Sequence, residues 1–428
     1  MMLDVETLKK ELGAGGLGGE LGRVYPDEAE NLYRRARLAR VLDSFTQLFP
    51  QHGRAALFSA PGRSEIGGNH TDHNNGRVLA AAVNLDAVAA ASENGLDEVR
   101  VKSENYSLDT VDLARLHPVR GEKGRSQSLI RGICAGFVAR GYRIGGFDAA
   151  TASDVIAGSG LSSSAAFEVL ICTVINHLFN AGRAGALEMA MIAQQAENEF
   201  FGKPCGLMDQ TACAVGGFVA IDFEDLAHPV IEKIDFDFAA CGHALCIVDT
   251  GGSHSGLTGE YAAVRGEMQA VAHELGKSVL RQVNPVDFAR ALPILRQAVG
   301  DRALLRAIHF FGENERVLRQ TALLSRGDFE AFKEEVVAGG RSSYMFNQNV
   351  YTTADSKQQP LALALALSES LLAGRGAWRL HGGGFAGTIQ AFVPFGMLEE
   401  YKARMESVFG EGRCHVLSVR SAGGVRIC

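Results

Sequence analysis

A glycine- and serine-rich stretch at residues 158–165 is the first place in this chain where backbone and side chains could do chemistry together. It reads Gly158-Ser159-Gly160-Leu161-Ser162-Ser163-Ser164-Ala165 and leads into a long apolar-periodic segment that ends near Phe179. The first N–H groups of a helix have no partner within it, and the helix dipole adds positive potential, so this position suits a phosphate group. The same residues also suit an ordinary helix cap, and the loop alone leaves both interpretations open.

The stretch differs from the two best-known nucleotide-binding loops. No Lys follows the glycines, which excludes the pattern G-x-x-x-x-G-K-[ST], and Ser163 stands where G-x-G-x-x-G would place its third Gly. A phosphate-binding role therefore depends on what the other polar segments contribute.

A block of short hydrogen-bonding side chains lies at Pro61–Gly76, around two adjacent glycines. Its polar members include Arg63, Glu65, Asn69, His70, Asp72, His73, Asn74 and Asn75. The block is too polar and too rich in glycine for a core segment, so we expect a loop whose side chains can bind several hydroxyls of a polyol at once. The alternatives are a solvated surface loop and a metal site at His70, Asp72 and His73, although so tight a run of ligands normally needs further ligands elsewhere.

Asp209 follows a Gly-Leu-Met sequence, so a single charge is expected at the edge of an apolar pocket. A carboxylate in such a place can accept the proton of a substrate hydroxyl, and an arginine nearby, such as Arg63, would keep it ionised and stabilise an alkoxide. The alternative is a helix N-cap at the start of Gln210–Val215.

The composition is that of a globular chain of 428 residues, 46% hydrophobic and 21% charged, which is long enough for two or three domains. The net charge of −7 and the pI near 6.0 oppose a general affinity for nucleic acid or anionic membranes. The eight cysteines form no C-x-x-C pair and are expected to be reduced and mostly buried.

Nothing in the sequence marks a targeting segment or an obligate protein partner. The first ten residues lack the apolar run of a secretory signal, and the most apolar segments, at 78–91 and 361–367, are interrupted or too short to span a bilayer. A soluble, cytoplasmic protein is therefore predicted.

Hydrophobic periodicity predicts the elements that would position these residues. In the first half it predicts helices at 26–49, 128–140 and 186–201 and after the loop at 158–165, and strands at 55–60, 78–92 and 147–153, with 78–92 paired to the segment around 100–102. In the second half it predicts strands at 231–238 and 244–249, helices at 258–275, 285–298, 303–324, 328–339 and 360–372, and a glycine turn that leads into a last strand ending near 393. Pro293 should kink or split the helix at 285–298.

Glu197 and Glu199 lie near the C-terminal end of the helix predicted at 186–201. A carboxylate there opposes the helix dipole, so a nearby cation is expected. An acidic segment at 222–229, which also contains a proline, interrupts the apolar pattern and marks the predicted domain boundary. We expect an N-terminal domain at 1–225, whose first 55 residues form an extension and a helix, and a C-terminal domain at 226–428.

Five blocks of the sequence together resemble the signatures of the GHMP superfamily of small-molecule kinases, and the first and third resemble galactokinases in particular. The blocks are P-G-R and H-T-D-x-N-x-G within Pro61–Gly76, G-x-G-L-S-S-S-A at Gly158–Ala165, P-C-G-L-M-D-Q at Pro204–Gln210, H-x-x-x-x-x-E-Y at His254–Tyr261 and G-G-G-F-A-G at Gly382–Gly387. The resemblance runs from about Ala60 to Val393. It implies an α+β, two-domain GHMP kinase fold with the active site in the cleft between the domains, and an ATP-dependent phosphotransferase.

The resemblance also implies roles for the matching residues. Asp209 matches the catalytic Asp and Arg63 its partner arginine, in a reaction that passes the γ-phosphoryl group of ATP to the anomeric hydroxyl of a sugar. The positions that hold the sugar are Asn69, His70, Asp72, Gly206 and Tyr261. The stretch at 158–165 matches the phosphate-binding loop, and Glu197 with Ser163 or Ser164 matches the magnesium site. Gly383, Gly384 and Phe385 belong to the third family signature, which supports the site.

Two positions depart from the galactokinase pattern R-x-N-L-I-G-E-H-T-D-Y. Asn69 replaces a glutamate that in the family reaches the C6 hydroxyl of the sugar, and His73 replaces the tyrosine. An amide can donate to an oxygen that a carboxylate would repel, so a sugar that is oxidised at C6 or lacks that carbon is an alternative substrate. The segment Ser126–Gly132 lacks the family's aromatic residues near the nucleotide, and Ile156 replaces a proline before the loop.

The leading hypothesis is a galactokinase-like enzyme of carbohydrate metabolism that binds ATP and Mg²⁺ and phosphorylates galactose or a close relative at C1. One alternative is a kinase for galacturonate or arabinose. Another is a non-catalytic sensor of sugar and ATP, as some galactokinase relatives are, although the intact serine loop and Asp209 favour an enzyme.

Overall fold

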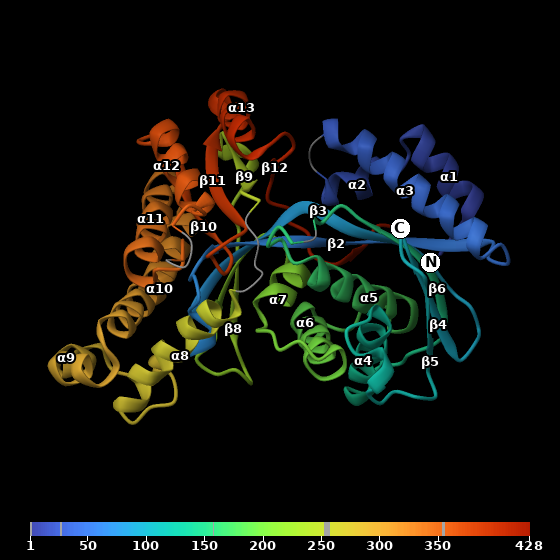
Figure 1. Cartoon of the computed structure of the whole chain (residues 1–428). Coiled ribbons are helices and arrows are strands. Elements are labelled where there is room, and N and C mark those ends of the chain that lie inside the picture. Colours follow the sequence, from blue (N-terminus) through green and yellow to red (C-terminus); the bar gives the residue numbers. More distant parts are fainter. Residues whose placement is uncertain (1, 26–27, 157, 252–256, 353–355) are drawn as a thin grey trace.

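The computed structural model describes residues 2–25, 28–156, 158–251, 257–352 and 356–428 (Figure 1). His254, which belongs to one of the motifs, lies outside this description. The first half contains β1 (Leu3–Asp4), α1 (Val5–Ala14), α2 (Gly18–Val24), α3 (Glu28–Leu48), β2 (Arg54–Gly67), β3 (Arg77–Glu93), β4 (Glu98–Ser103), β5 (Leu108–Asp112), α4 (Ser126–Ala139), β6 (Phe147–Ser153), α5 (Ser163–Phe179), α6 (Ala186–Gln195), α7 (Met208–Val215) and β7 (Phe218–Asp222). The second half contains β8 (Val230–Ile234), β9 (His243–Asp249), α8 (Thr258–Glu274), α9 (Pro285–Val299), α10 (Asp301–Ser325), α11 (Phe329–Ser342), α12 (Pro360–Leu372), β10 (Ala377–His381), β11 (Thr388–Pro394), α13 (Leu398–Phe409), β12 (Cys414–Leu417) and β13 (Val425–Arg426).

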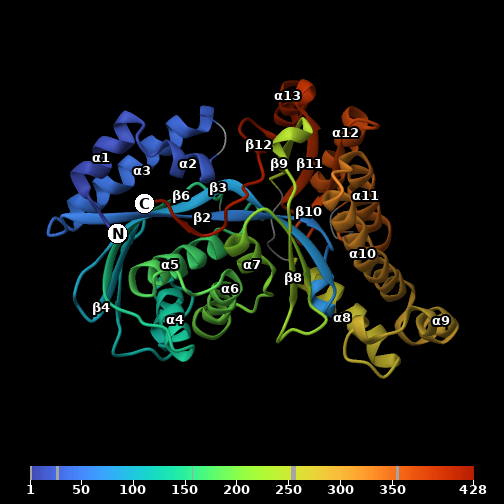
Figure 2. The same ribbon diagram turned by 180° about the vertical axis from the view of Figure 1, so that it is seen from behind.

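The larger sheet is built around the long antiparallel pair β2 and β3. Its strand order is β1-β2-β3-β6-β4-β5, with β7 and β8 continuing from the first part of β3 and β13 added to β2. Helices α1–α3 cover one face and α4–α7 the other, as Figure 2 shows from behind. Leu57 and Val88 pack with α1–α3, whereas their neighbours Phe58 and Ala89 pack on the opposite face. Burial on both faces explains why β3 is an almost continuous apolar run.

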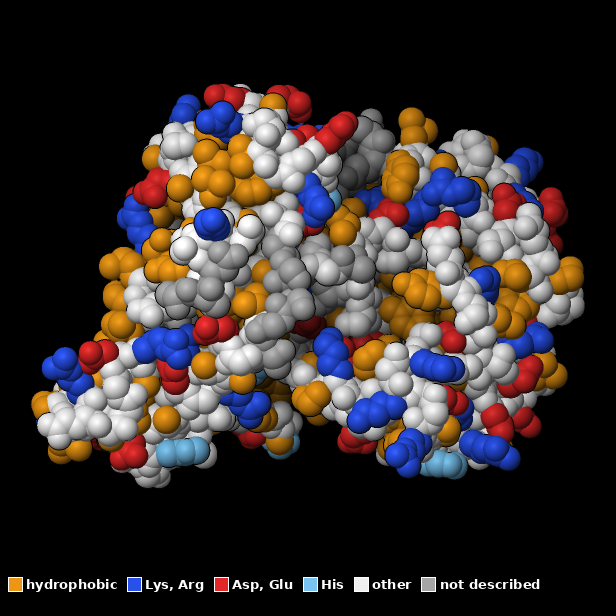
Figure 3. Space-filling model, in the orientation of Figure 1, with side chains coloured by type: hydrophobic (Ala, Val, Ile, Leu, Met, Phe, Trp, Pro, Cys, Tyr) orange, Lys and Arg blue, Asp and Glu red, His pale blue; other side chains and the backbone are white. Residues whose placement is uncertain are grey.

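The smaller sheet has the order β10-β11-β9-β12 and is entirely antiparallel. Its side chains pack against α12 and α13, as Leu380 and Ile389 do with Leu361 and Tyr401. Helices together with sheets that are antiparallel except for the parallel pair β4 and β6 make this the predicted α+β arrangement. Side chains of both charge signs are interspersed over the face in Figure 3. Among the described residues, no helix is both long enough and apolar enough to cross a membrane.

Most predicted helices and strands are confirmed, including the helix after the glycine- and serine-rich loop. All eight cysteines are free, and five of them are buried. The predicted boundary at 225/226 stays a prediction; β8, just after it, pairs with β7 in the larger sheet, and β13 returns to pair with β2.

Two predictions about local structure are wrong, and a third is wrong in one of its two alternatives. The segment Pro61–Gly67 is not a loop but the end of β2, and residues 61–69 are buried. The strand at 78–92 does not pair with the segment around 100–102, because β6 lies between β3 and β4. Pro293 does not split its helix, since α9 runs unbroken from Pro285 to Val299, while a kink at Pro293 stays a prediction.

The buried carboxylate of Asp86, on β3, connects the N-terminal helices to the C-terminal segment. It accepts hydrogen bonds from Arg37 and Ser59, from the hydroxyl of Tyr25 at 2.5 Å and from Arg420 at 2.9 Å. Burial raises the pKa of this carboxyl, but the charges of Arg37 and Arg420 outweigh burial and hold the pKa well below its usual range. Segments from both ends of the chain therefore depend on one negative charge.

Replacing this charge should destabilise the whole fold. We expect Asp86→Asn to lower the free energy of unfolding at pH 7 by about 3–5 kcal/mol, because buried Arg420 loses its counter-charge and buried Arg37 keeps only that of Asp154. Because the pKa of Asp86 is lowered by folding, its stabilisation is complete above the ordinary carboxyl pKa and is lost as the pH falls toward the folded-state pKa. Urea unfolding from pH 7 to pH 3 checks both points, with the exposed Asp97→Asn as control; equal stability of the two variants at pH 7 would contradict this role.

Candidate active site

Arg63 on β2 and Asp209 on α7 form the central ion pair of the site. Nε of Arg63 lies 2.8 Å from Oδ1 of Asp209, and an NH2 nitrogen of the same guanidinium lies 2.6 Å from that oxygen. Burial raises the pKa of the Asp209 carboxyl, but the charge of Arg63 and the hydrogen bond from Ser162 outweigh burial and lower that pKa. Asp209 is therefore ionised at neutral pH, and its side chain is still 30% exposed. It does not cap α7, whose N-cap is Leu207.

The loop before α5 is fastened to this ion pair. Gly158 and Gly160 bend it with φ angles of 78° and 77°, and Ser162 is also left-handed. The hydroxyl of Ser162 donates to Asp209 and makes no capping hydrogen bond, so the ordinary helix cap is absent. The backbone N–H of Arg63 donates to the carbonyl of Leu161 at 3.0 Å. The N–H groups of the first turn of α5 are thus left without a side-chain cap, beside an ionised carboxylate and an arginine.

A buried histidine from the C-terminal half supports the same loop, and sequence reasoning missed it. A Cβ on Gly160 would lie 3.1 Å from the ring of His381, so the loop packs on that ring. Nδ1 of His381 lies 2.9 Å from Oγ1 of Thr388, which donates to the carbonyl of Ser159 at 3.2 Å, and Nε2 lies 3.0 Å from Oγ of Ser64. Burial and the nearby arginine charges lower the pKa of His381 to about 3. The ring is therefore neutral and supports the loop through hydrogen bonds. The available signal in the sequence was the place of His381 directly before the glycine-rich block Gly382–Gly387.

Four residues predicted to hold a sugar lie near that glycine-rich block or near one another. Nε2 of His70 lies 2.8 Å from the carbonyl oxygen of Gly383, and the hydroxyl of Tyr261 donates to the next carbonyl at 2.7 Å. A Cβ on Gly206 would lie 3.1 Å from Oδ2 of Asp72, so these two residues are neighbours. Burial lowers the pKa of His70, which leaves its ring neutral at physiological pH.

Asn69 is the fifth of these residues, and every hydrogen-bonding position of its side-chain amide is used within the protein. Its Nδ2 donates to Oε1 of Glu65 at 3.0 Å and to the carbonyl of Gly382 at 2.8 Å. Its Oδ1 accepts from Nδ2 of Asn349 at 2.9 Å and from the hydroxyl of Ser343 at 3.3 Å. An amide offers two donors and two acceptor positions, so no capacity remains, and the side chain is buried.

Glu197, at the start of a π-helical turn (Ala196–Phe201), has a cation beside it as the helix dipole predicted. Its Oε1 lies 2.8 Å from Nζ of Lys203, and its Oε2 accepts from Nε2 of Gln210 at 2.9 Å. The same Nε2 also donates to Glu168 on α5 at 3.0 Å. Burial and the adjacent Glu197 raise the pKa of Glu168. Neither Lys203 nor Glu168 was predicted from the sequence.

The residues predicted to hold Mg²⁺ offer oxygen donors of the kind this ion prefers. The hydroxyls of Ser163 and Ser164, in the first turn of α5, make no hydrogen bond within the described part of the chain. Ser164 lies one helical turn before Glu168 on the same face of α5, and Glu168 shares Gln210 with Glu197. Mg²⁺ commonly takes one or two carboxylates together with phosphate oxygens and water, so the donor set fits. No group of three or more His, Cys, Asp or Glu that could hold a metal alone occurs within the described ranges.

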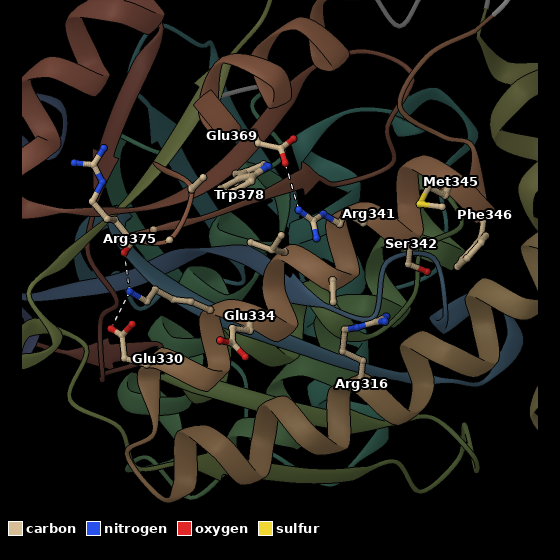
Figure 4. Close-up of a pocket in the computed structure, with 16 residues that line it drawn as sticks. Arg316, Glu330, Glu334, Arg341, Ser342, Met345, Phe346, Glu369, Arg375 and Trp378 are labelled. Atoms are coloured by element: carbon tan, nitrogen blue, oxygen red, sulfur yellow. Dashed lines mark hydrogen bonds and ion pairs between the residues drawn. The ribbon is translucent and has the colours of Figure 1, made fainter. Parts of the chain in front are cut away.

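A separate hollow of about 460 Å³ lies between α11, α12 and β10 (Figure 4). Arg341 and Glu369 form an ion pair of 3.3 Å beside Trp378. None of the predicted site residues lines this hollow. Ser342 on its wall bonds to Nδ1 of His309 at 2.9 Å, and Nε2 of His309 lies 2.9 Å from the carbonyl oxygen of Asn69. The hollow thus lies behind the segment that carries Asn69 and is distinct from the site.

Comparison with known proteins gives two family matches within this chain. The GHMP kinases N terminal domain matches residues 128–217, and the galactokinase galactose-binding signature matches residues 43–93. A galactokinase of Streptomyces coelicolor is 34% identical over 356 residues, which cover 82% of this chain and 88% of the relative. A galactokinase of Thermotoga petrophila is 33% identical over 330 residues, covering 77% and 87%.

Solved structures agree with this at the level of the fold. The galactokinase of Lactococcus lactis in complex with galactose superposes with a TM-score of 0.74 at 22% identity, covering 90% of this chain and 98% of the other. The mevalonate kinase of L. major in complex with R-mevalonate gives a TM-score of 0.56 at 14% identity, covering 85% and 96%.

The close packing at the end of β2 can be tested with a pair of glycine variants. Gly68 and Gly95 both have positive φ, at 81° and 70°, but only at Gly68 would a Cβ meet backbone, 2.3 Å from the carbonyl oxygen of Arg77. We expect Gly95→Ala to cost about 1–2 kcal/mol of unfolding free energy from φ alone. Gly68→Ala should cost about 1–3 kcal/mol more because of overpacking. Chemical denaturation of both variants measures the difference, and equal losses would show that the backbone contact is unimportant.

Proposed function

Because the chain belongs to the galactokinase family of the GHMP kinases, and is therefore a sugar kinase with ATP as phosphoryl donor, we propose that it phosphorylates the C1 hydroxyl of galactose or a close neutral relative. The observation that carries this proposal is the junction of Arg63, Asp209 and Ser162. It joins an ionised carboxylate, its arginine partner and the uncapped start of a helix at one place.

Asp209 acts as the general base in this proposal. Its oxygen takes the proton of the C1 hydroxyl while the C1 oxygen forms a bond to the γ-phosphorus and the bond from that phosphorus to the β–γ bridging oxygen breaks, so that ADP leaves. Arg63 keeps Asp209 ionised before the reaction and balances the charge that develops on the sugar oxygen. The partial exposure of Asp209 supports this role, since a base must reach its substrate.

The loop at 158–165 and the first turn of α5 bind the phosphates of ATP. Backbone N–H groups and the helix dipole favour the negative charge there. The buried ring of His381 packs on the loop and holds it in place together with Thr388. Glu197 with Ser163 or Ser164 would hold Mg²⁺. When bound, that ion neutralises part of the charge on the phosphates.

His70, Asp72, Gly206 and Tyr261 form the sugar side of the site in this proposal. Asn69 is a positioning residue in this proposal. All hydrogen-bonding positions of its amide are used within the protein, and they fix the sugar-binding segment to the glycine-rich block Gly382–Gly387. The carboxylate of Glu65 lies against Asn69 and forms an ion pair of 2.7 Å with Arg379. That pair compensates the charge of Glu65, and both N–H donors of Asn69 are used within the protein, so no free donor remains there for the carboxylate of a uronic acid. The surroundings of Asn69 therefore support galactose rather than galacturonate.

The proposed base gives a direct test. Asp209→Asn should lower kcat for ATP-dependent galactose phosphorylation by about 10²–10⁴, since the amide cannot accept the proton. Galactose 1-phosphate formation measures the effect, and Asp225→Asn, at an exposed position, is the matched control. A near-normal rate in Asp209→Asn with an intact fold would refute the assignment.

The proposed acceptor can be tested with a panel of sugars. ATP consumption with galactose, arabinose, galacturonate and N-acetylgalactosamine should show kcat/KM for galactose at least about tenfold above that for galacturonate, a difference of about 1.4 kcal/mol. The reason is that both N–H donors of Asn69 are used within the protein, so a carboxylate at C6 would lose water without gaining a donor there. Equal or faster turnover of galacturonate would instead support the alternative kinase for C6-modified sugars.

A further inference from the structure

Lys203 is placed by the backbone next to the carboxylate that we assign to Mg²⁺. Gly202, with φ of 83°, ends the π-helical turn, and the N–H groups of Gly202 and Lys203 both donate to the carbonyl of Glu197, at 2.9 and 3.1 Å. Both hydrogen bonds that close the turn therefore end on the carbonyl oxygen of Glu197. The turn brings Nζ of Lys203 to 2.8 Å from Oε1 of Glu197.

Glu197 needs a positive charge whether or not a metal is bound. Its side chain is only 3% exposed, and the buried carboxyl of Glu168 lies on the other side of Gln210. Two carboxyl groups that share one amide in a buried site are unfavourable unless a cation compensates them. Lys203 supplies that cation within the described part of the chain.

The two partners of this ion pair differ in their freedom to move. The side chain of Lys203 is 60% exposed, whereas that of Glu197 is buried. A lysine carries its charge on a flexible four-carbon stem and forms no rigid bidentate pair, so it can leave one anion for another nearby. Gln210, which donates to Glu197, directly follows Asp209, and Asp209 accepts from Ser162 of the loop at 158–165. The ion pair of Lys203 and Glu197 therefore lies beside the loop to which we assign the phosphates of ATP.

We propose that Lys203 holds the cation position at Glu197 in the free enzyme and moves its ammonium to the phosphates of ATP when Mg²⁺ occupies Glu197. This inference rests on the proposed function for the position of the phosphates. Lys203 is then both a competitor of the metal in the absence of nucleotide and a ligand of the nucleotide once the metal has entered. Replacing Lys203 should therefore tighten metal binding in the free enzyme and weaken ATP binding in the presence of the metal.

The first measurement is metal binding without sugar or nucleotide. Titration of the full-length protein with Mn²⁺, followed by electron paramagnetic resonance of the free ion, should show about tenfold tighter binding to Lys203→Met than to wild type, the factor expected when an internal competitor fills the site about nine-tenths of the time. Lys123→Met is the matched control, because the stem of Lys123 packs on Gly202 but forms no ion pair with Glu197. Glu197→Gln in the Lys203→Met background should abolish the tighter binding.

The second measurement is nucleotide affinity at saturating Mg²⁺. Lys203→Met should raise the Kd for ATP, measured by calorimetry, about tenfold, and Lys203→Arg should recover most of the loss. Unchanged or weaker Mn²⁺ binding in Lys203→Met, or unchanged ATP affinity, would overturn the proposal. Such a result together with normal galactose phosphorylation would leave the proposed function standing. Absence of any sugar phosphate from the wild-type enzyme would instead reject the proposed function.

Discussion

The buried polar run at the end of β2 is the constraint on which the rest of the structure depends. A polar side chain in the core costs free energy unless it finds a hydrogen-bond partner, and a charged one costs more. Arg63 finds Asp209 on α7, Ser64 finds His381 on β10, and Glu65 finds Arg379 on the same strand. These partners come from distant parts of the chain, so their contacts constrain how the two halves pack. That packing arrangement is also the one that assembles the candidate site.

The sequence predicts the regular elements well because their patterns are local. It predicts this polar run poorly because the partners of its side chains lie far away in the chain. Amphipathic helices such as α10 and apolar strands such as β3 reveal themselves through local periodicity, because the solvent and the core select opposite faces. The segment Pro61–Gly67 lacks such a pattern, since its polar groups are satisfied by residues 146 to 317 positions later in the chain. The pairing of β3 with β6 rather than β4 is likewise set by strand order, which periodicity does not encode.

Within the site, the residues that carry charge were easier to find than those that hold them in place. Arg63, Asp209 and Glu197 stand in glycine-rich or polar blocks that are unusual in themselves. His381 and Thr388 read as ordinary strand residues, and only the fold shows that they brace the loop at 158–165. Only the tertiary structure shows that Ser162 does not cap α5, because its hydroxyl donates to Asp209 instead.

The two ion pairs of the site are built for different tasks. Arg63 is buried, stays charged at any physiological pH and contacts Asp209 through two nitrogens, so its partner is kept ionised and fixed in position. Lys203 is exposed and contacts Glu197 through a single flexible ammonium. In the proposed function, the general base has to keep one protonation state and one geometry until the substrate arrives, whereas the proposed metal-binding carboxylate has to give up its resident cation each time the metal enters. An arginine at the first place and a lysine at the second meet these different requirements.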